Sequence, residues 1–402
     1  MISYDEALQR ALDGVPHPAR ERVSVTDAVG RVLTDDVTAR VALPAFDHSS
    51  MDGWAVATRA FSGDGPWTLP IEGESRAGAE GLAPLRDGSA MRIFTGAPLP
   101  RGADAVVPQE DASRDGDLVR FERVPAVNAF VRRRGDDVSL GGAFARAGTR
   151  VTPWHVAAFT AAEVPSVCVA RRPRVSILAT GDELREAGEP PSQRSVADAI
   201  TPALAALVRR LGGEPRVLPF ARDEATATRD AVTDALRGAD LVLTVGGVSV
   251  GDHDPCAARS SPRASRSTSG VAIKPGKPLC LGHAPDGARV LGLPGNPSSA
   301  LLTFALFGAP LLRAMQGERR VQPPPLRRDA RARDHPPAGR REFYRVTLDD
   351  DSDGLPVATP LANQASGSAL SLAAADALMD VPAAVTHLPA GATVRCFWLR
   401  DV

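Results

Sequence analysis

The stretch ADLVLTVGGVSVGDHD, residues 239–254, contains the pattern that decides the fold. Its apolar run, LVLTV, is followed at once by a loop of glycine and acidic residues, which is typical of a buried parallel strand with a polar loop at its carboxyl end. The same order occurs in RVSILATGDEL (174–184) and ARVLGLPGNPSSA (288–300). Stretches of helical length separate these runs, so we predict a βαβ arrangement and a doubly wound α/β domain.

The neighbouring segments extend this pattern. PRVLPFARD (215–223) and VAIKPGKPLCLG (271–282) read as further strands with their loops, and we expect helices at 198–211, 224–237 and 298–315. In open α/β sheets ligands bind outside the carboxyl ends of the strands. The loops TGDE, RDE, GGVSVGDHD, KPGKP and PGNP should therefore converge on one edge of the sheet, which we call the rim.

Other parts of the chain have a different pattern of apolar and turn residues. MISYDEALQRAL has the capping-box pattern Ser3-x-x-Glu6 and predicts an N-terminal helix, and short strands with a tight helix should follow it up to about residue 41. Residues 44–153 alternate short apolar runs with Gly and Pro turns, which indicates an all-β module, and a helix is expected at 155–162. The flanking segments could pack together as a stalk. Residues 321–337 read as a proline-rich linker or a meandering edge, and the C-terminal part as a small β module.

The composition limits the classes of function. With 402 residues, 47 basic and 48 acidic, the chain has a formal net charge of -1, so no overall field favours nucleic acid or an anionic membrane. The four cysteines form no CxxC pair, which argues against zinc or disulfides, and no run approaches membrane-spanning length. We expect several domains of a soluble, cytoplasmic protein.

The lysine count singles out one motif. Only two of the 47 basic residues are lysines, Lys274 and Lys277, and both lie in KPGKP. A GC-rich genome would explain the excess of arginine, and a surviving lysine then suggests a place for a compact ammonium group. Two ammonium groups held by Pro275 and Pro278 suit a fixed anion, whereas the alternatives are an ordinary surface turn or chance.

Acidic residues are expected on the same rim. Asp182 and Glu183, Asp223, and Asp252-x-Asp254 lie in three successive loops. Carboxylates gathered in one place repel one another unless a cation lies among them, and Mg²⁺ with phosphate oxygens is a common solution. Any one of these acids could instead cap the helix that follows it. Together with the lysines, they favour a metal and phosphate site.

Two loops could supply backbone N–H groups to an anion. Gly246-Gly247-Val248-Ser249-Val250-Gly251 can nest around phosphate oxygens, although such a loop is often only a turn. PGNP, residues 294–297, is stiff and places Asn296 just before a helix. The fingerprints G-x-G-x-x-G and GxxxxGK[ST] are missing, so a dehydrogenase or a P-loop enzyme is not expected.

Polar residues are concentrated in the motifs of the first half and in the segment 256–270. In the first half, PAFDHSSMDGWAV carries Asp47, Ser49, Ser50 and Asp52, and RIFTGAPLP ends a strand at Thr95. The arginine run at 132–134 reads as a solvated face or a web of salt bridges. The segment CAARSSPRASRSTSG, residues 256–270, has no apolar face where a helix is expected. A flexible loop would explain it, as would a pair of compensating frameshifts.

Taken together, seven motifs in order closely resemble the molybdopterin molybdenumtransferase family and the E domain of gephyrin. The motifs are FDHSSMDGWAV, RIFTGAPLP, RRRGDDV, ATGDEL, GGVSVGDHD, AIKPGKP and GLPGNPSSA. The resemblance implies an elongated stalk (1–43 and 138–172), a β-rich domain (44–137), a molybdopterin-binding α/β domain (173–320) and a C-terminal β-barrel (321–402). It also implies a homodimer whose clefts combine both subunits.

The resemblance implies the reaction and its residues. Adenylylated molybdopterin and molybdate, with Mg²⁺, would give molybdenum cofactor and AMP, and the further partners would be an adenylyltransferase and acceptor molybdoenzymes. The implied catalytic residues are Asp52, Thr95, Asp137, Glu183, Asp223 and Asp254. The metal ligands are Asp182, Glu183, Asp223 and Asp254. The implied binding residues are Lys274, Lys277, Pro294, Pro297, Arg340 and Ser366. The two loops that could supply N–H groups to an anion add Gly246, Gly247, Ser249 and Asn296 to the candidate binding residues.

Two departures from the family pattern and two rival functions remain. The first departure is the segment 256–270, which lacks the expected helix, and the second lies at residues 198–200. Asp198-Ala199-Ile200 stands where the family commonly has Asp-x-Asn. A non-catalytic molybdopterin-binding scaffold on the same fold is one rival, and an adenylyltransferase that makes the adenylylated intermediate is the other. An intact acidic set on the rim argues against the scaffold.

Overall fold

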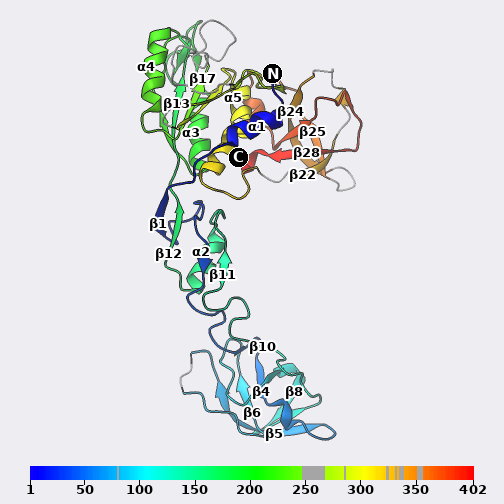
Figure 1. Ribbon diagram of the computed structural model, residues 1–402. Helices are drawn as coiled ribbons and strands as arrows, with labels where there is room; N and C mark the ends of the chain where they lie inside the picture. Colours follow the sequence, from blue (N-terminus) through cyan, green and yellow to red (C-terminus); the bar gives the residue numbers. More distant parts are fainter. Residues whose placement is uncertain are drawn as a thin grey trace.

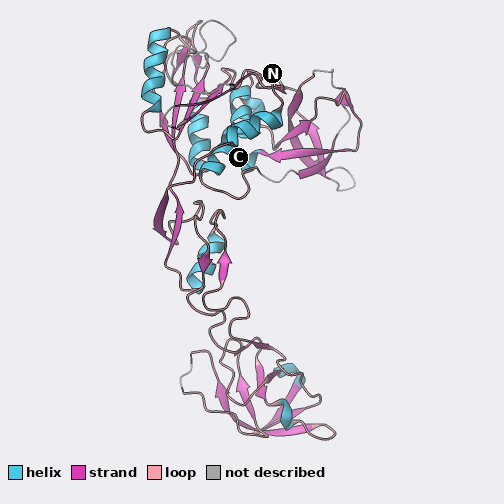
Figure 2. Cartoon of the chain, viewed as in Figure 1, coloured by secondary structure: helices cyan, strands magenta, loops and turns pink. Residues whose placement is uncertain are grey.

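The computed structural model describes residues 1–78, 81–246, 268–284, 287–322, 326–330, 333–334, 339–350 and 356–402. The chain forms a broad head, a narrow stalk below it and a β module at the far end (Figure 1). Both termini lie in the head. Figure 2 shows that most helices lie in the head, whereas the stalk and the lower β module consist mainly of strands and loops.

A six-stranded mixed sheet forms one half of the head. Its order is β16-β13-β17-β21-β20-β18, and the first four of these strands run parallel. β20 and β18 run antiparallel at one edge. The strands are β13 (Arg174–Ala179), β16 (Glu214–Val217), β17 (Leu241–Val245), β18 (Thr268–Ser269), β20 (Cys280–His283) and β21 (Arg289–Leu293). The predicted α/β domain is therefore present, with an antiparallel edge that the sequence did not indicate.

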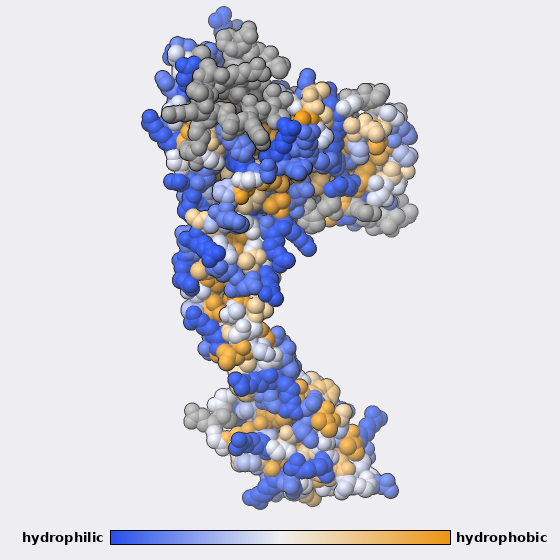
Figure 3. All heavy atoms as spheres, in the orientation of Figure 1, coloured by the Kyte–Doolittle hydropathy of each residue, from blue (hydrophilic) through white to orange (hydrophobic). Residues whose placement is uncertain are grey.

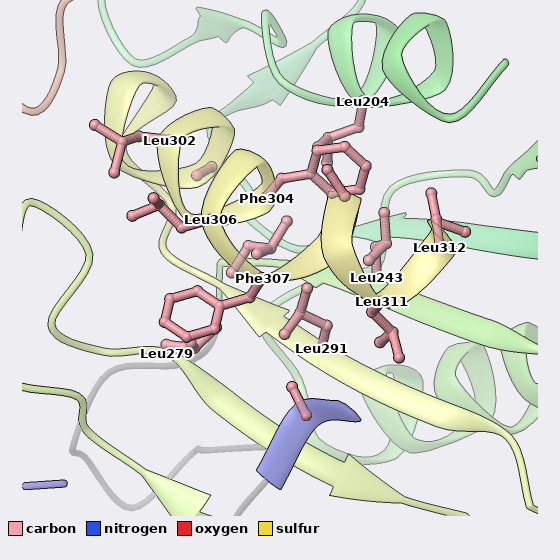
Figure 4. Close-up of a cluster of buried hydrophobic side chains, with 14 of the residues drawn as sticks. Leu204, Leu243, Leu279, Leu291, Leu302, Phe304, Leu306, Phe307, Leu311 and Leu312 are labelled. Carbon is pink, nitrogen blue, oxygen red and sulfur yellow. The ribbon is translucent and has the colours of Figure 1, made fainter. Parts of the chain in front are cut away.

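Helices cover both faces of this sheet. On one face, Leu204 of α3 (Thr201–Arg210) packs with Leu243, Leu291 and Phe307 in a large apolar cluster, which Figure 4 shows. On the other face, α4 (Ala225–Leu236) packs against inner residues of β13 and β17 in a second cluster. This two-sided cover is what the expected doubly wound arrangement requires.

The closing helix has three parts, α5 (Pro297–Thr303), a π-helical turn (Phe304–Gly308) and α6 (Ala309–Met315). Pro310 has no backbone N–H to donate, and the wider turn just before it accommodates that gap. Contrary to our expectation, Pro297–Met315 is long and apolar enough to cross a membrane, with a mean hydropathy of 1.4. However, 83% of its apolar window is buried inside the head, as in a core helix.

The predicted strand at 271–282 is in fact two strands in two sheets. β19 (Ile273–Lys274) pairs with β24 (Arg341–Asp350) of the C-terminal part, and β20 belongs to the α/β sheet. The chain turns between them at Gly276, whose φ is +106° and where a Cβ would lie 2.4 Å from Thr303 Oγ1. A side chain would therefore not fit this turn.

The C-terminal strands close into a barrel. β24, β25 (Pro356–Pro360), β22 (Leu326–Ala330), β28 (Ala392–Trp398) and β26 (Ala377–Val381) form a ring, which the pairing of β24 with β26 completes. The expected linker at 321–337 is wrong in part, because it contains β22. Inside the barrel, burial raises the pKa of Cys396 to about 12. α1 (Tyr4–Leu12), which begins at the predicted Ser3 cap, is joined to β24 by the ion pair of Arg341 with Asp5.

The stalk and the lower β module make up the rest of the molecule. In the stalk, β1 (Arg20–Ser24) pairs with β12 (Ser166–Ala170), and α2 (Pro153–Ala161) buries Phe159. Residues 25–30 form turns rather than the expected tight helix. The stalk also contains β2 (Val37–Thr38) and β11 (Ala143–Ala145).

The lower β module consists of β4 (Gly53–Val56), β5 (Trp67–Ser75), β6 (Ala90–Ile93), β7 (Ala105–Pro108), β8 (Ala112–Asp115) and β9 (Leu118–Phe121), together with β3 (His48–Ser49) paired with β10 (Val131–Arg132).

Short elements complete the described chain: β14 (Leu184–Arg185), β15 (Val196–Ala197), β23 (Arg333–Asp334), β27 (His387–Leu388), α7 (Leu370–Ala373) and the 3-10 helices η1 (Thr58–Ala60), η2 (Gln109–Asp111) and η5 (Leu399–Asp401). The lower module is built mainly from β-strands, as predicted. The residue boundaries between the four expected domains stay a prediction.

Candidate active site

The carboxyl ends of β13, β17 and β21 meet at the predicted rim. The N–H of Thr180 donates to Val245 O (2.9 Å), and the N–H of Gly246 donates to Leu293 O (3.2 Å). Gly246 has φ +81°, and a Cβ there would lie 2.7 Å from Thr180 O. A Cβ on Gly295 would lie 3.6 Å from the Cα of Gly246. The loops after these strands therefore pack backbone against backbone, with little room for side chains between them.

KPGKP reaches the same rim by a different route from the one expected. The loop precedes the antiparallel strand β20 instead of following a parallel strand, and Cys280 at the start of β20 lies opposite Gly292 near the end of β21. The start of an antiparallel strand lies at the same edge as the ends of its parallel neighbours. Lys277 is exposed, and Lys274 Nζ donates to Glu342 Oε1 of β24 at 3.0 Å.

Two of the predicted acidic residues lie side by side on the rim. The backbone N–H of Asp223 donates to Asp182 Oδ1 at 3.4 Å, and both residues are exposed. The Glu183 carboxylate folds back beside Gly181, where a Cβ would be 2.7 Å from Oε2. Exposed carboxylate oxygens are suitable ligands for Mg²⁺.

A complete metal cluster is not formed by the described residues. Within those ranges no group of three or more His, Cys, Asp or Glu side chains is placed to hold a metal ion. Asp254, together with Gly247, Ser249 and the segment with the hypothetical frameshift up to residue 267, lies outside the described residues. The four-carboxylate metal site stays a prediction.

The PGNP loop is joined to the C-terminal part of the chain. Ser366 O accepts hydrogen bonds from the N–H groups of Ser298 (3.0 Å) and Ser299 (3.3 Å) at the start of α5. Ser366 is therefore at the rim through its backbone. Pro294 is buried, Asn296 is exposed, and Arg340 lies in the turn before β24.

The sequence missed a buried cation behind this loop. Arg345 of β24 is 0% exposed, and its guanidinium donates to Ser298 Oγ. Among the described residues it has no ion-pair partner, and its Nε has no hydrogen-bond partner. Burial lowers the pKa of Arg345, since a buried guanidinium loses the solvation of its charge. A positive charge without a carboxylate favours an anion at the neighbouring rim.

The candidates of the first half form a second group in the lower β module. Asp52 Oδ1 accepts from the N–H (2.7 Å) and the hydroxyl (2.8 Å) of Thr95. These bonds, with the charge of Arg92, hold the pKa of Asp52 below its usual value. Asp137 is paired with Arg132 at 2.7 Å, and Arg133 with Asp47, so these two arginines follow the salt-bridge alternative for the arginine run.

The two groups lie at opposite ends of the molecule. The strands next to Asp52 and Thr95, β4 and β6, are in the lower β module, and those that form the rim are in the head, with the stalk between them (Figure 1). A single copy of the chain therefore does not bring all predicted site residues together.

Comparison with known families covers most of the chain. Residues 2–162 match the MoeA N-terminal region (domain I and II), residues 176–314 a probable molybdopterin binding domain, and residues 328–397 the MoeA C-terminal region (domain IV).

Several relatives and solved structures are similar over nearly their whole length. A molybdopterin molybdenumtransferase from Nostoc sp. is 34% identical over 93% of this chain and 87% of its own. One from Bacillus subtilis is 31% identical over 100% of this chain and 94% of its own. The crystal structure of the molybdopterin biosynthesis moeA protein from Pyrococcus horikoshii OT3 superposes with a TM-score of 0.84 and 27% identity, covering 99% of this chain and 100% of that one. The chain belongs to the MoeA family, with the molybdopterin-binding α/β domain and the closed C-terminal barrel of that fold.

Proposed function

We propose that the chain is a molybdopterin molybdenumtransferase, which inserts molybdate into adenylylated molybdopterin and releases AMP. The observation that carries this proposal is the rim, where two lysines and exposed carboxylates lie around tightly packed loops. Cations suit the phosphate and molybdate oxyanions, and carboxylates suit a divalent metal. Relatives that are about a third identical carry this activity in their names.

Each group on the rim has a distinct role in the proposed reaction. Lys274, Lys277 and the backbone of Gly246 would bind substrate oxyanions, and Pro294, Asn296, Pro297 and Ser366 would shape the pocket beside the buried charge of Arg345. Asp182 and Asp223, with Glu183 and Asp254, would hold Mg²⁺, which when bound neutralises charge on the phosphoanhydride. The chain's own contribution is to position oxyanions and neutralise their charge, so no covalent nucleophile is needed.

We further propose a homodimer in which the lower β module of one copy completes the rim of the other. Asp52, Thr95 and Asp137 belong to the predicted site but lie close to β4, β6 and β10, at the other end of the molecule from the rim. Large apolar side chains are exposed in the stalk, with Trp154 at 83% and Leu140 at 63%. Figure 3 shows hydrophobic surface along the stalk and the lower β module. Exposed apolar surface of this kind is typical of an interface between copies.

The surroundings of the reaction follow from its chemistry. An adenylyltransferase would supply the substrate, and molybdoenzymes would accept the product. The isolated cysteines suit a reducing compartment, so we place the reaction in the cytoplasm.

Incubation of the purified protein with adenylylated molybdopterin, molybdate and Mg²⁺ tests the activity. We expect release of AMP and formation of molybdenum cofactor. Folded, dimeric protein that binds molybdopterin but releases no AMP would support a scaffold instead. Adenylylation of molybdopterin with ATP, without AMP release from the adenylylated form, would support an adenylyltransferase.

A further inference from the structure

A buried carboxylate of the C-terminal barrel contacts one of the two lysines of the α/β domain. Glu342 lies on β24, directly opposite Lys274 of β19 in a parallel pair. Glu342 Oε1 accepts a hydrogen bond from Lys274 Nζ at 3.0 Å. The Glu342 side chain is 7% exposed, whereas that of Lys274 is 50% exposed. The carboxylate is thus fixed inside the protein, and the lysine side chain faces outward from it.

The second oxygen of this carboxylate is also held. The Tyr344 hydroxyl donates to Glu342 Oε2 from two residues further along β24. Tyr344 itself is buried in the apolar interior of the barrel. With both oxygens in hydrogen bonds, the Glu342 carboxylate has a defined orientation, and the barrel wall determines it.

This arrangement limits the freedom of Lys274. A free lysine side chain samples many rotamers, and fixing one of them costs conformational entropy when a ligand binds. An ammonium group has three N–H donors, and Glu342 accepts one of them, which leaves the others for a ligand on the rim. The ion pair therefore fixes the direction of Lys274 before an anion arrives.

We propose that Glu342 is a positioning residue for Lys274, so that the C-terminal barrel orients a substrate-binding group of the α/β domain. This inference rests on the proposed function, because Lys274 is taken as an oxyanion-binding residue. Glu342 would act only through the lysine, with Tyr344 as its support. A purely structural ion pair that ties the barrel to the α/β domain is the competing explanation.

The direction in which one substitution changes anion binding distinguishes positioning from simple electrostatics. Glu342→Gln removes a negative charge close to an oxyanion site, and charge alone would then strengthen anion binding. Loss of positioning would weaken it. We expect the dissociation constant of adenylylated molybdopterin, measured by equilibrium titration without molybdate, to rise about tenfold in this variant.

A matched control variant distinguishes an effect on stability from an effect on the position of Lys274. Asp380 is another buried carboxylate of the barrel, and its partner is Arg341, also on β24. Asp380→Asn should lower the melting temperature at least as much as Glu342→Gln, but should leave the dissociation constant unchanged. Equal weakening of binding in both variants would overturn the proposal in favour of general destabilisation.

A double-mutant cycle provides the decisive readout. In a Lys274→Met background Glu342 has no ammonium to orient, so Glu342→Gln should no longer weaken binding. Equal weakening with and without Lys274, or tighter binding in the single variant, would overturn the proposal. Wild-type protein is assayed in parallel for AMP release, so that failure of the proposed function is distinguished from failure of this inference.

Discussion

The acidic residues of the lower β module and those on the rim of the head differ in their hydrogen bonds. In the lower β module, Asp52 accepts two hydrogen bonds from Thr95, and Asp137 is paired with Arg132. On the rim of the head, Asp182 and Asp223 are exposed, and a single backbone contact of 3.4 Å joins them. The lower carboxylates are oriented by the fold, whereas Asp182 and Asp223 share no further side-chain hydrogen bond with the part of the chain that the structure describes.

This difference suggests different tasks. Oxygens without protein donors can take a cation, since a metal ion replaces water at little structural cost. A carboxylate that already accepts two hydrogen bonds is better suited to orient a substrate group than to change ligands. We therefore expect substitutions of the rim carboxylates to affect chemistry without affecting stability, and loss of a single hydrogen-bond donor to a lower carboxylate to have a milder, pH-dependent effect.

The largest effect is expected on the rim. Asp223→Asn keeps the shape of the side chain but removes a charge from the proposed Mg²⁺ site, and AMP release should fall by about a hundredfold or more. Because the side chain is exposed, the melting temperature should hardly change. Asp230→Asn, on the exposed side of α4, is the control and should keep full activity. A fully active Asp223 variant would contradict a metal role for this rim.

A smaller loss is expected when a lysine of KPGKP is replaced by arginine. Lys274→Arg and Lys277→Arg keep the charge but replace a compact ammonium with a broad planar group, and we expect kcat/KM to fall by about tenfold or more. Arg237→Lys, the reverse exchange on the surface, is the control, since Arg237 is 74% exposed. Normal activity of both arginine variants would mean that the two lysines reflect chance.

The smallest effect concerns Asp52 and pH. Thr95→Val removes one of the two donors that hold the pKa of Asp52 below its usual value, so that this pKa should rise. If the ionised carboxylate is required, activity is lost as pH falls through this pKa, and the acid side of the pH profile should move to higher pH. Near neutral pH the carboxylate stays ionised, and activity should change less than about threefold.

A second threonine and aspartate pair in the lower β module serves as the control. Thr58 Oγ1 donates to Asp104 Oδ2 at 2.8 Å, so Thr58→Val removes a similar hydrogen bond away from the candidate residues. Its pH profile should match that of the wild type. An unshifted profile in the Thr95 variant would argue against a role for ionised Asp52.

Much of the fold could be predicted from local pattern. The runs at 175–179 and 241–245 are buried throughout and mostly apolar because helices cover both faces of their sheet, and they read clearly as parallel strands. KPGKP was placed on the correct rim for the wrong reason, since nothing in its composition shows that β19 pairs with the barrel. Likewise β22 could not be recognised among prolines and arginines, because its partners lie far along the chain.

The residues that were missed depend on tertiary contacts. REFYRV reads as an ordinary strand, yet Glu342 and Arg345 are both buried. Their partners, Lys274 and Ser298, are 68 and 47 residues away in sequence. Charged side chains among aromatic residues in a strand are the signal that could have indicated a buried polar function.

The central claim is that one site combines the rim of one copy with the lower β module of another. Mixing two inactive variants tests it: Asp52→Ala damages the lower module and Lys274→Met damages the rim. If copies exchange, half of the dimers are mixed and one of their two sites is intact, so the mixture should recover about a quarter of wild-type AMP release. No recovery in a mixture shown to contain mixed dimers would contradict the shared site.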